Sequence, residues 1–172
     1  MKTRREFIQG LIISMGGAAT LSACGDKPPT VMATAPNNAG RFYSSEEMAL
    51  VSRVSDLIIP ETETPGALQT NVAGYLDGLM SDWASAQTQA EHRAALTRLR
   101  RDLDAAVGGP FERASQEAAE AALTDLDARA FEIDQSLEGY RRFKGWITQA
   151  FFATEEGATQ ELQWVALPGR WD

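Results

Sequence analysis

Few side chains in this 172-residue sequence have a spacing that could support chemistry. Two pairs of carboxylates are the first candidates: Glu61 and Glu63 in a Thr- and Pro-rich segment, and Glu155 and Glu156 after an aromatic stretch. Paired carboxylates that face each other across a cleft can hydrolyse glycosides, and clustered carboxylates can bind divalent cations. Solvated acids in loops are common, and no recognisable ligand spacing accompanies these four. We therefore expect neither catalysis nor a metal site here.

The single histidine, His92, is a weak candidate for general acid–base catalysis. It lies between Glu91 and Arg93 in the first turn of a predicted helix, where a solvated surface side chain is expected. The sequence contains no CxxC, haem-attachment CxxCH, HExxH or GxSxG motif, no phosphate-binding Gly loop and no GxGxxG fingerprint. The chain itself is predicted to hold no catalytic residue and no cofactor.

The N-terminus carries an export motif instead of a catalytic one. Arg4 and Arg5, followed by Phe7, form a twin-arginine pattern, which addresses already folded proteins for export. An Arg pair also serves as the basic region of a general secretory signal, so the twin-arginine translocase is an expectation. The apolar run that follows is short and rich in Gly and Ala, which suits a signal peptide better than a membrane span.

The only cysteine, Cys24, ends the sequence Leu-Ser-Ala-Cys at 21–24. This is a lipobox pattern, in which the signal is cut before a cysteine that then carries lipid. We predict a signal peptide over 1–23 and a lipid-anchored mature protein on the periplasmic side of a bacterial membrane. Gly25 differs from the Asp that favours inner-membrane retention, so the outer membrane is favoured. An uncleaved N-terminal transmembrane helix is the alternative.

Charge and length narrow the range of partners. Removing residues 1–23 lowers the basic residues from 16 to 13 and the acidic residues from 24 to 23, which leaves a net charge of −10. Such a charge opposes binding to nucleic acid and to anionic lipid headgroups, whereas it suits a basic protein surface. An acidic solvated surface is the commoner explanation of such a charge. The mature chain is long enough for one domain with a substantial core and too short for two.

The mature chain divides into a linker and a helical domain. Residues 24–41 are rich in Pro, Ala, Asn and Thr, and we predict a flexible linker there. Residues 42–172 are predicted to form an all-α domain of about five helices, because apolar residues recur at 3–4 spacing. Two capping boxes, Ser44 with Glu47 and Thr88 with Glu91, and a capping Ser115 mark helix starts. The helices are expected over about 45–59, 72–83, 89–107, 116–126 and 137–152.

The last nine residues form a different kind of segment. Trp164 and Trp171 lie in an irregular stretch that also contains Pro168, Gly169 and Arg170. This stretch must pack on its own domain or on another protein, and the sequence leaves both open. Trp and Arg are favoured anchors of protein interfaces.

Two separated motifs resemble one known family. Residues 56–67, Asp-Leu-Ile-Ile-Pro-Glu-Thr-Glu-Thr-Pro-Gly-Ala, resemble the D-x-I-I-P-x-x-x-T-P-G-A segment of the gluconate 2-dehydrogenase subunit 3 family. The resemblance continues at 151–162 and at Pro168-Gly169-Arg170-Trp171, and it spans about 42–172.

This resemblance implies a non-catalytic small subunit of a membrane-associated dehydrogenase that oxidises sugars or sugar acids. In such complexes a large subunit of the glucose-methanol-choline (GMC) oxidoreductase type holds FAD, and a c-type cytochrome with haem c commonly receives the electrons. The small subunit carries the export signal and supports maturation of the large one. A lipobox is not a requirement of the family, so Cys24 suggests that this complex is anchored through its small subunit.

The expected partner surface combines the two motif segments. We predict Trp164, Arg170 and Trp171 as anchors, with the loop at Thr64, Pro65 and Gly66 nearby. A free-standing periplasmic lipoprotein that acts as a binding or scaffold module is the alternative. An enzyme in its own right is a third possibility from the sequence.

Overall fold

The computed structural model describes residues 32–35, 40–132 and 135–162. The chain divides into two units, Met1–Thr30 and Val31–Asp172, and all described residues belong to the second. The predicted signal peptide lies outside the described residues, and so do the predictions for Arg4, Arg5, Phe7 and Cys24. The same holds for the proposed anchors at the C-terminus, Trp164, Arg170 and Trp171.

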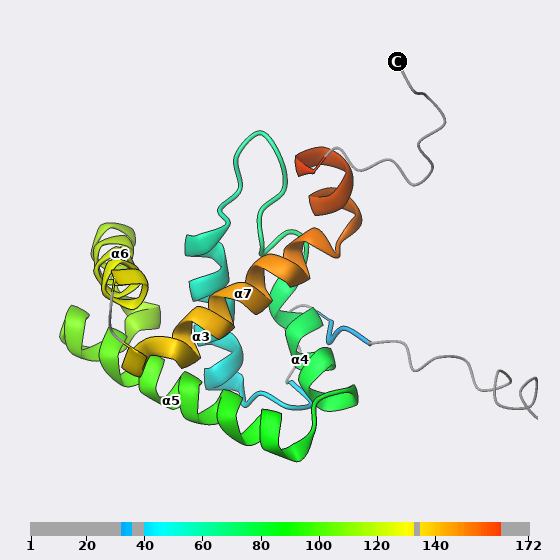
Figure 1. Cartoon of the computed structure of the whole chain (residues 1–172). Coiled ribbons are helices and arrows are strands. Elements are labelled where there is room, and N and C mark those ends of the chain that lie inside the picture. Colours follow the sequence, from blue (N-terminus) through cyan, green and yellow to red (C-terminus); the bar gives the residue numbers. More distant parts are fainter. Residues whose placement is uncertain (1–31, 36–39, 133–134, 163–172) are drawn as a thin grey trace, which may run out of the picture. The chain divides into compact units, whose positions relative to one another are not determined.

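The described part of the chain is helical and contains no strand, which confirms the predicted all-α class (Figure 1). The described residues contain five α-helices, which are α3 (Ser45–Ile58), α4 (Val72–Asp82), α5 (Ala86–Val107), α6 (Gln116–Glu132) and α7 (Glu138–Phe152). Short turns of other helical types lie between α5 and α6, between α6 and α7, and after α7. The turns are the 3-10 helices η1 (Phe111–Arg113) and η2 (Gln135–Leu137) and the π-helical turn η3 (Gly157–Glu161).

Two of the three predicted helix caps are confirmed and one is wrong. The Ser44 side chain accepts from the Glu47 amide at 3.1 Å, and the Glu47 carboxylate accepts from the Ser44 amide at 2.9 Å. Ser115 likewise accepts from the amide of residue 118 at 3.2 Å. The third predicted cap, Thr88, lies inside α5, because Ser85 one turn earlier accepts from the Thr88 amide and caps the helix.

Helix α6 is longer than predicted. It continues past Leu126 to Glu132 because its last turns still bury apolar side chains: Leu126 and Ala130 are each only 1% exposed. Burial of such side chains stabilises a helix more than its intrinsic propensity does.

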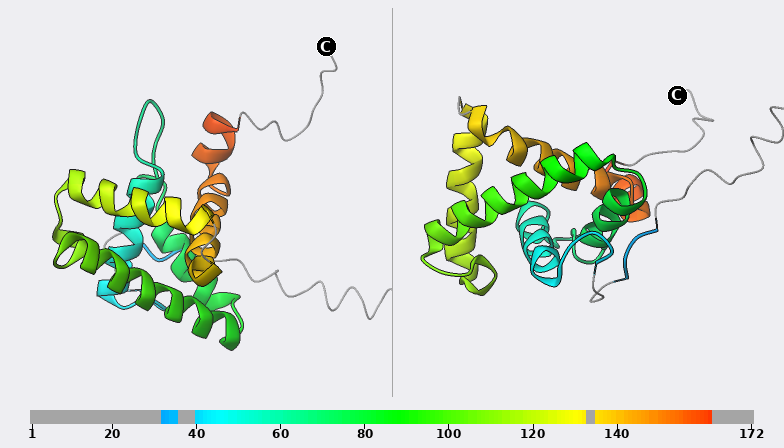
Figure 2. Two further views of the ribbon diagram at one scale, coloured as in Figure 1. Left: turned by 60° about the vertical axis from the view of Figure 1, so that its left-hand side comes forward. Right: turned by 90° about the horizontal axis from the view of Figure 1, so that it is seen from below.

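The core lies where α7 packs against α4 and α5, with α3 against α4 and α6 against α5 (Figures 1 and 2). Its members come from every α-helix and from η1. Completely buried side chains at its centre include Leu50, Val51, Val54, Leu76, Leu103, Phe111 and Ile147.

The folded part begins before the predicted domain boundary. Residues 32–35 and 40–43, hereafter the N-terminal clasp, pack along α4, although the sequence placed 32–35 in the linker. Gly74 and Gly78 make this possible, because a Cβ atom on Gly74 would lie 2.1 Å from the Thr34 carbonyl oxygen. The Thr34 amide in turn donates to the Gly74 carbonyl at 2.9 Å.

A buried carboxylate, Asp77, ties the clasp to α4. It accepts from the Thr34 hydroxyl and from the backbone amides of Arg41, Phe42 and Tyr43, the amides lying at 2.7–2.9 Å. Burial raises the pKa of Asp77, and these hydrogen bonds lower it. The combined effect of the hydrogen bonds is larger, so the pKa lies below its ordinary value. Each of the two carboxylate oxygens of Asp77 therefore accepts two hydrogen bonds.

Candidate functional site

The first resembling motif forms a closed loop at the end of α3. Pro60 cannot continue the helix, and the chain returns so that the Ala67 amide donates to the Ile59 carbonyl at 2.8 Å. Gly66 closes this loop, because a Cβ atom there would lie 2.5 Å from the Glu61 amide nitrogen. The Gly66 requirement is therefore steric. We call residues 60–66 the motif loop.

Side chains next to the motif loop fix its shape. Gln69 accepts from the Gly66 amide at 3.1 Å and donates to the Glu61 carboxylate at 2.7 Å. The Thr62 amide donates to the Thr64 carbonyl at 3.1 Å across the tip. Figure 1 shows the loop extending from the helices beside η3.

The second resembling motif reverses the chain after α7. The Thr154 hydroxyl donates to the Phe151 carbonyl at 2.6 Å and accepts from the Gly157 amide at 3.1 Å. A Cβ atom on Gly157 would lie 2.2 Å from the Phe151 carbonyl oxygen, so the turn needs glycine here. The reversal places η3 opposite the motif loop.

The two motifs meet at an open groove of about 390 Å³, hereafter the motif groove. The Thr64 hydroxyl donates to the Glu161 carboxylate across it, which joins residues 97 positions apart. The floor and walls are largely apolar. They comprise Ile58, Ile59, Pro60, Thr62, Thr64, Pro65, Thr148, Phe151, Phe152 and Glu161.

The predicted interface residues of the loop take two roles here. Thr64 and Pro65 line the motif groove, whereas Gly66 is buried at the base of the loop. Of the four carboxylates weighed as catalytic, Glu61 and Glu63 lie in the exposed motif loop. Glu155 is also exposed, and Glu156 is half-buried just before η3. The carboxylate that reaches the opposite motif is Glu161, which the sequence did not single out.

His92 does not lie on the surface, and this prediction is wrong. Its side chain is 2% exposed, and its Nε2 lies 2.6 Å from the Tyr43 hydroxyl. The ring is enclosed by aromatic side chains, with the Trp146 centroid 4.9 Å away. Burial lowers the pKa of His92 to about 4, so the imidazole is neutral near pH 7. His92, a residue of α5, therefore contacts the clasp through Tyr43 and α7 through Trp146.

Within the described residues, no three side chains of His, Cys, Asp or Glu gather closely enough to hold a metal ion. In the same residues, no helix combines the length and the hydrophobicity that a membrane span requires.

Comparison with known proteins identifies the family. The family model described as gluconate 2-dehydrogenase subunit 3 matches residues 45–169, which cover most of the chain. The chain belongs to this family, and the resemblance of its two motifs is thereby confirmed. Neither a curated protein nor a solved structure gives a significant match.

Proposed function

We propose that this chain is the non-catalytic small subunit of a periplasmic, FAD-dependent dehydrogenase complex that oxidises a sugar or sugar acid. Its match to a family described as a dehydrogenase subunit carries this proposal. The catalytic partner would be a GMC-type flavoprotein holding FAD, with a c-type cytochrome as the further electron acceptor. The small subunit would escort the flavoprotein through the twin-arginine translocase and hold the complex at a membrane through lipid on Cys24.

The motif groove supports a role in binding another protein. The two motifs that resemble the family form the two walls of the groove. Gly66 and Gly157 allow the close backbone contacts within these walls. The walls leave an apolar groove open to solvent instead of filling it. An exposed apolar groove rimmed by polar residues is typical of a surface that binds another molecule.

The export motif supports the escort role. A folded-protein signal at Arg4 and Arg5 precedes a domain whose sequence has no cofactor-binding motif. Such a signal is useful when a second protein folds around its cofactor inside the cell and crosses the membrane as a passenger. Lipid at Cys24 would then keep the exported complex at the membrane, since two or more acyl chains anchor stably.

Co-purification from detergent-solubilised membranes tests the complex. A tag at the C-terminus of the full chain should retain a flavoprotein, identified by flavin absorbance and mass spectrometry. The chain purified without partners should be colourless and without dehydrogenase activity. A flavin bound to the isolated chain, or a wild-type chain that retains no flavoprotein, would contradict the proposal.

Two substitutions test the export and anchoring parts separately. Replacing Arg4 and Arg5 by Lys should leave both this chain and the flavoprotein in the cytoplasm. Cys24→Ser should block lipidation and signal cleavage at this site. A flavoprotein that still reached the periplasm in the first variant would exclude the escort role, and normally processed protein in the second would exclude the lipobox.

A further inference from the structure

We infer that the motif groove binds a segment of the flavoprotein subunit in which an apolar side chain is flanked by Lys or Arg. This inference rests on the proposed function and specifies the chemistry of the contact. It is drawn from the distribution of charge around the groove.

The floor of the groove offers an apolar anchor site. Ile58, Ile59 and Phe152 pack against the core, line the open groove and are each only partly buried. Leu162, which directly follows Glu161, is 56% exposed. Covering these side chains with an apolar partner residue would remove their surface from water.

One carboxylate lines the groove and two more flank the lining residue Thr62, and we call these three the rim residues. Glu161 lines the groove, and Glu61 and Glu63 belong to the loop that forms the opposite wall. None of these carboxylates forms an ion pair with a described residue. Residues 54–92 and 145–169, which supply every lining residue of the groove, contain no Lys or Arg.

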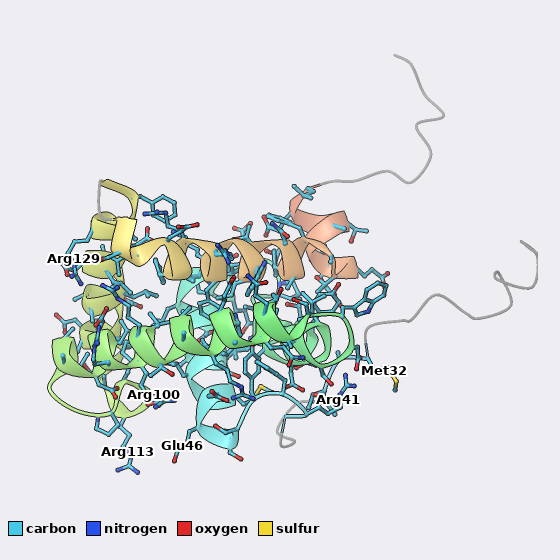
Figure 3. The ribbon with its side chains drawn as sticks, turned by 60° about the horizontal axis from the view of Figure 1, so that its bottom comes forward. Met32, Arg41, Glu46, Arg100, Arg113 and Arg129 are labelled. Carbon is cyan, nitrogen blue, oxygen red and sulfur yellow. The ribbon has the colours of Figure 1, made fainter. Side chains whose placement is uncertain are left out.

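Most basic residues of the domain lie away from the groove. Nine of the 13 basic residues after position 23 lie within 93–144. Many of them pair with nearby acids, such as Arg93 with Glu47 at 2.8 Å and Lys144 with Asp127 at 2.6 Å. Figure 3 shows Arg100, Arg113 and Arg129 near α5 and α6, at the end away from η3. Glu61, Glu63 and Glu161 thus lie without an ion pair to a described residue at an apolar groove whose own segments carry no cation, and a cationic partner segment would complement both features.

Charge reversal at the rim tests this inference. In a variant with Glu61→Lys, Glu63→Lys and Glu161→Lys, affinity for the co-purifying flavoprotein should fall at least about thirtyfold at low salt. The matched control reverses three exposed acids on α6: Glu117→Lys, Glu120→Lys and Asp125→Lys. Both variants change the net charge equally, so general electrostatic steering predicts equal losses, whereas the groove predicts a loss only in the first.

Substitution of the same three rim residues by Gln provides a milder version that keeps an oxygen for the Thr64 hydroxyl. This triple variant should bind several-fold more weakly than wild type, and its affinity should depend less on salt concentration. Unfolding curves of every variant should match the wild type, which separates a binding effect from a folding effect.

Truncation after residue 162 distinguishes the two possible occupants of the groove. If the partner segment occupies it, rim reversal should weaken binding by the same factor in the truncated chain. If the chain's own last ten residues occupy it, truncation should abolish the effect of rim reversal, which would overturn the inference.

Equal binding by the rim and control variants would also overturn the inference and leave the proposed function intact. A wild-type chain that binds no flavoprotein would refute the proposed function itself.

Discussion

The N-terminal clasp and the motif groove use polar side chains in opposite ways. Against the clasp, Asp77 of α4 is buried and accepts hydrogen bonds on both oxygens, and His92 of α5 is buried against Tyr43. At the groove, Glu61 and Glu63 are exposed and lack cationic partners among the described residues. The difference indicates that the clasp serves the stability of the domain, and it supports the proposal that the groove contacts another molecule.

The largest effect should come from removing the Asp77 carboxylate, which binds the clasp to α4. Asp77→Ala leaves three backbone amides and the Thr34 hydroxyl without their acceptor, and we expect a loss of about 4 kcal/mol in the free energy of unfolding. Chemical denaturation of the two proteins measures this. Asp125→Ala on exposed α6 is the control and should change the free energy by less than about 0.5 kcal/mol. Equal losses would show that Asp77 does not hold the clasp.

The next largest effect concerns pH. The pKa of His92 is about 4 in the folded chain and 6.5 in its ordinary state, so the unfolded chain takes up the proton first as pH falls. Stability should therefore decrease between about pH 6.5 and 4, by roughly 3 kcal/mol in all. The groups facing the ring are Tyr43, Glu47 and Arg93.

His92→Gln should remove this component, and the difference between wild-type and variant unfolding curves across pH isolates it from other titrating groups. The variant with Gln at 61, 63 and 161 should retain the His92-dependent loss of stability at low pH. A pH profile that His92→Gln leaves unchanged would show that the imidazole is not sealed in the folded state.

A pair of glycines tests the close approach of the clasp. Gly74→Ala places a methyl group against the Thr34 carbonyl oxygen and should cost about 2 kcal/mol of stability. Gly145 on α7 has open space where a Cβ atom would lie, with nothing within 4 Å, so Gly145→Ala should stabilise the helix by about 0.5–1 kcal/mol. Thermal unfolding of both variants gives the comparison. Opposite signs are expected, and a stabilising Gly74→Ala would contradict the packing of residues 32–35 on α4.

The smallest effect on stability is expected at the groove. Gln at 61, 63 and 161 removes no ion pair among the described residues, so the free energy of unfolding should change by less than about 0.5 kcal/mol. Differential scanning calorimetry checks this. A loss comparable to that of Asp77→Ala would mean that the groove, like the clasp, serves mainly the fold.

Apolar spacing and capping residues predicted α3, α4 and α7 closely, because these helices bury a regular stripe of side chains. The misplaced start of α5 led to the error on His92. With Ser85 as cap, His92 continues the buried stripe of Leu96, Leu99 and Leu103, and that spacing was readable in the sequence. The cap assignment alone had placed it in a solvated first turn.

Other features depend on contacts between distant residues and could not be predicted. Asp77 shares the buried face of α4 with Ala73 and Met80, which marks it as unusual, but its partners 34–43 positions away are set by tertiary packing. In the same way, resemblance identified both motifs but not their meeting. The contact between Thr64 and Glu161 depends on how α7 crosses the domain.

Amide hydrogen exchange, compared between the free chain and the chain bound to the proposed flavoprotein partner, tests most directly whether the motif groove contacts that partner. Binding should slow exchange in the motif loop and in residues 153–162, and it should leave α6 unchanged. Exchange that slows only in α6 and η1, with the motif loop and η3 unaffected, would contradict the assignment of the groove as the partner-binding surface.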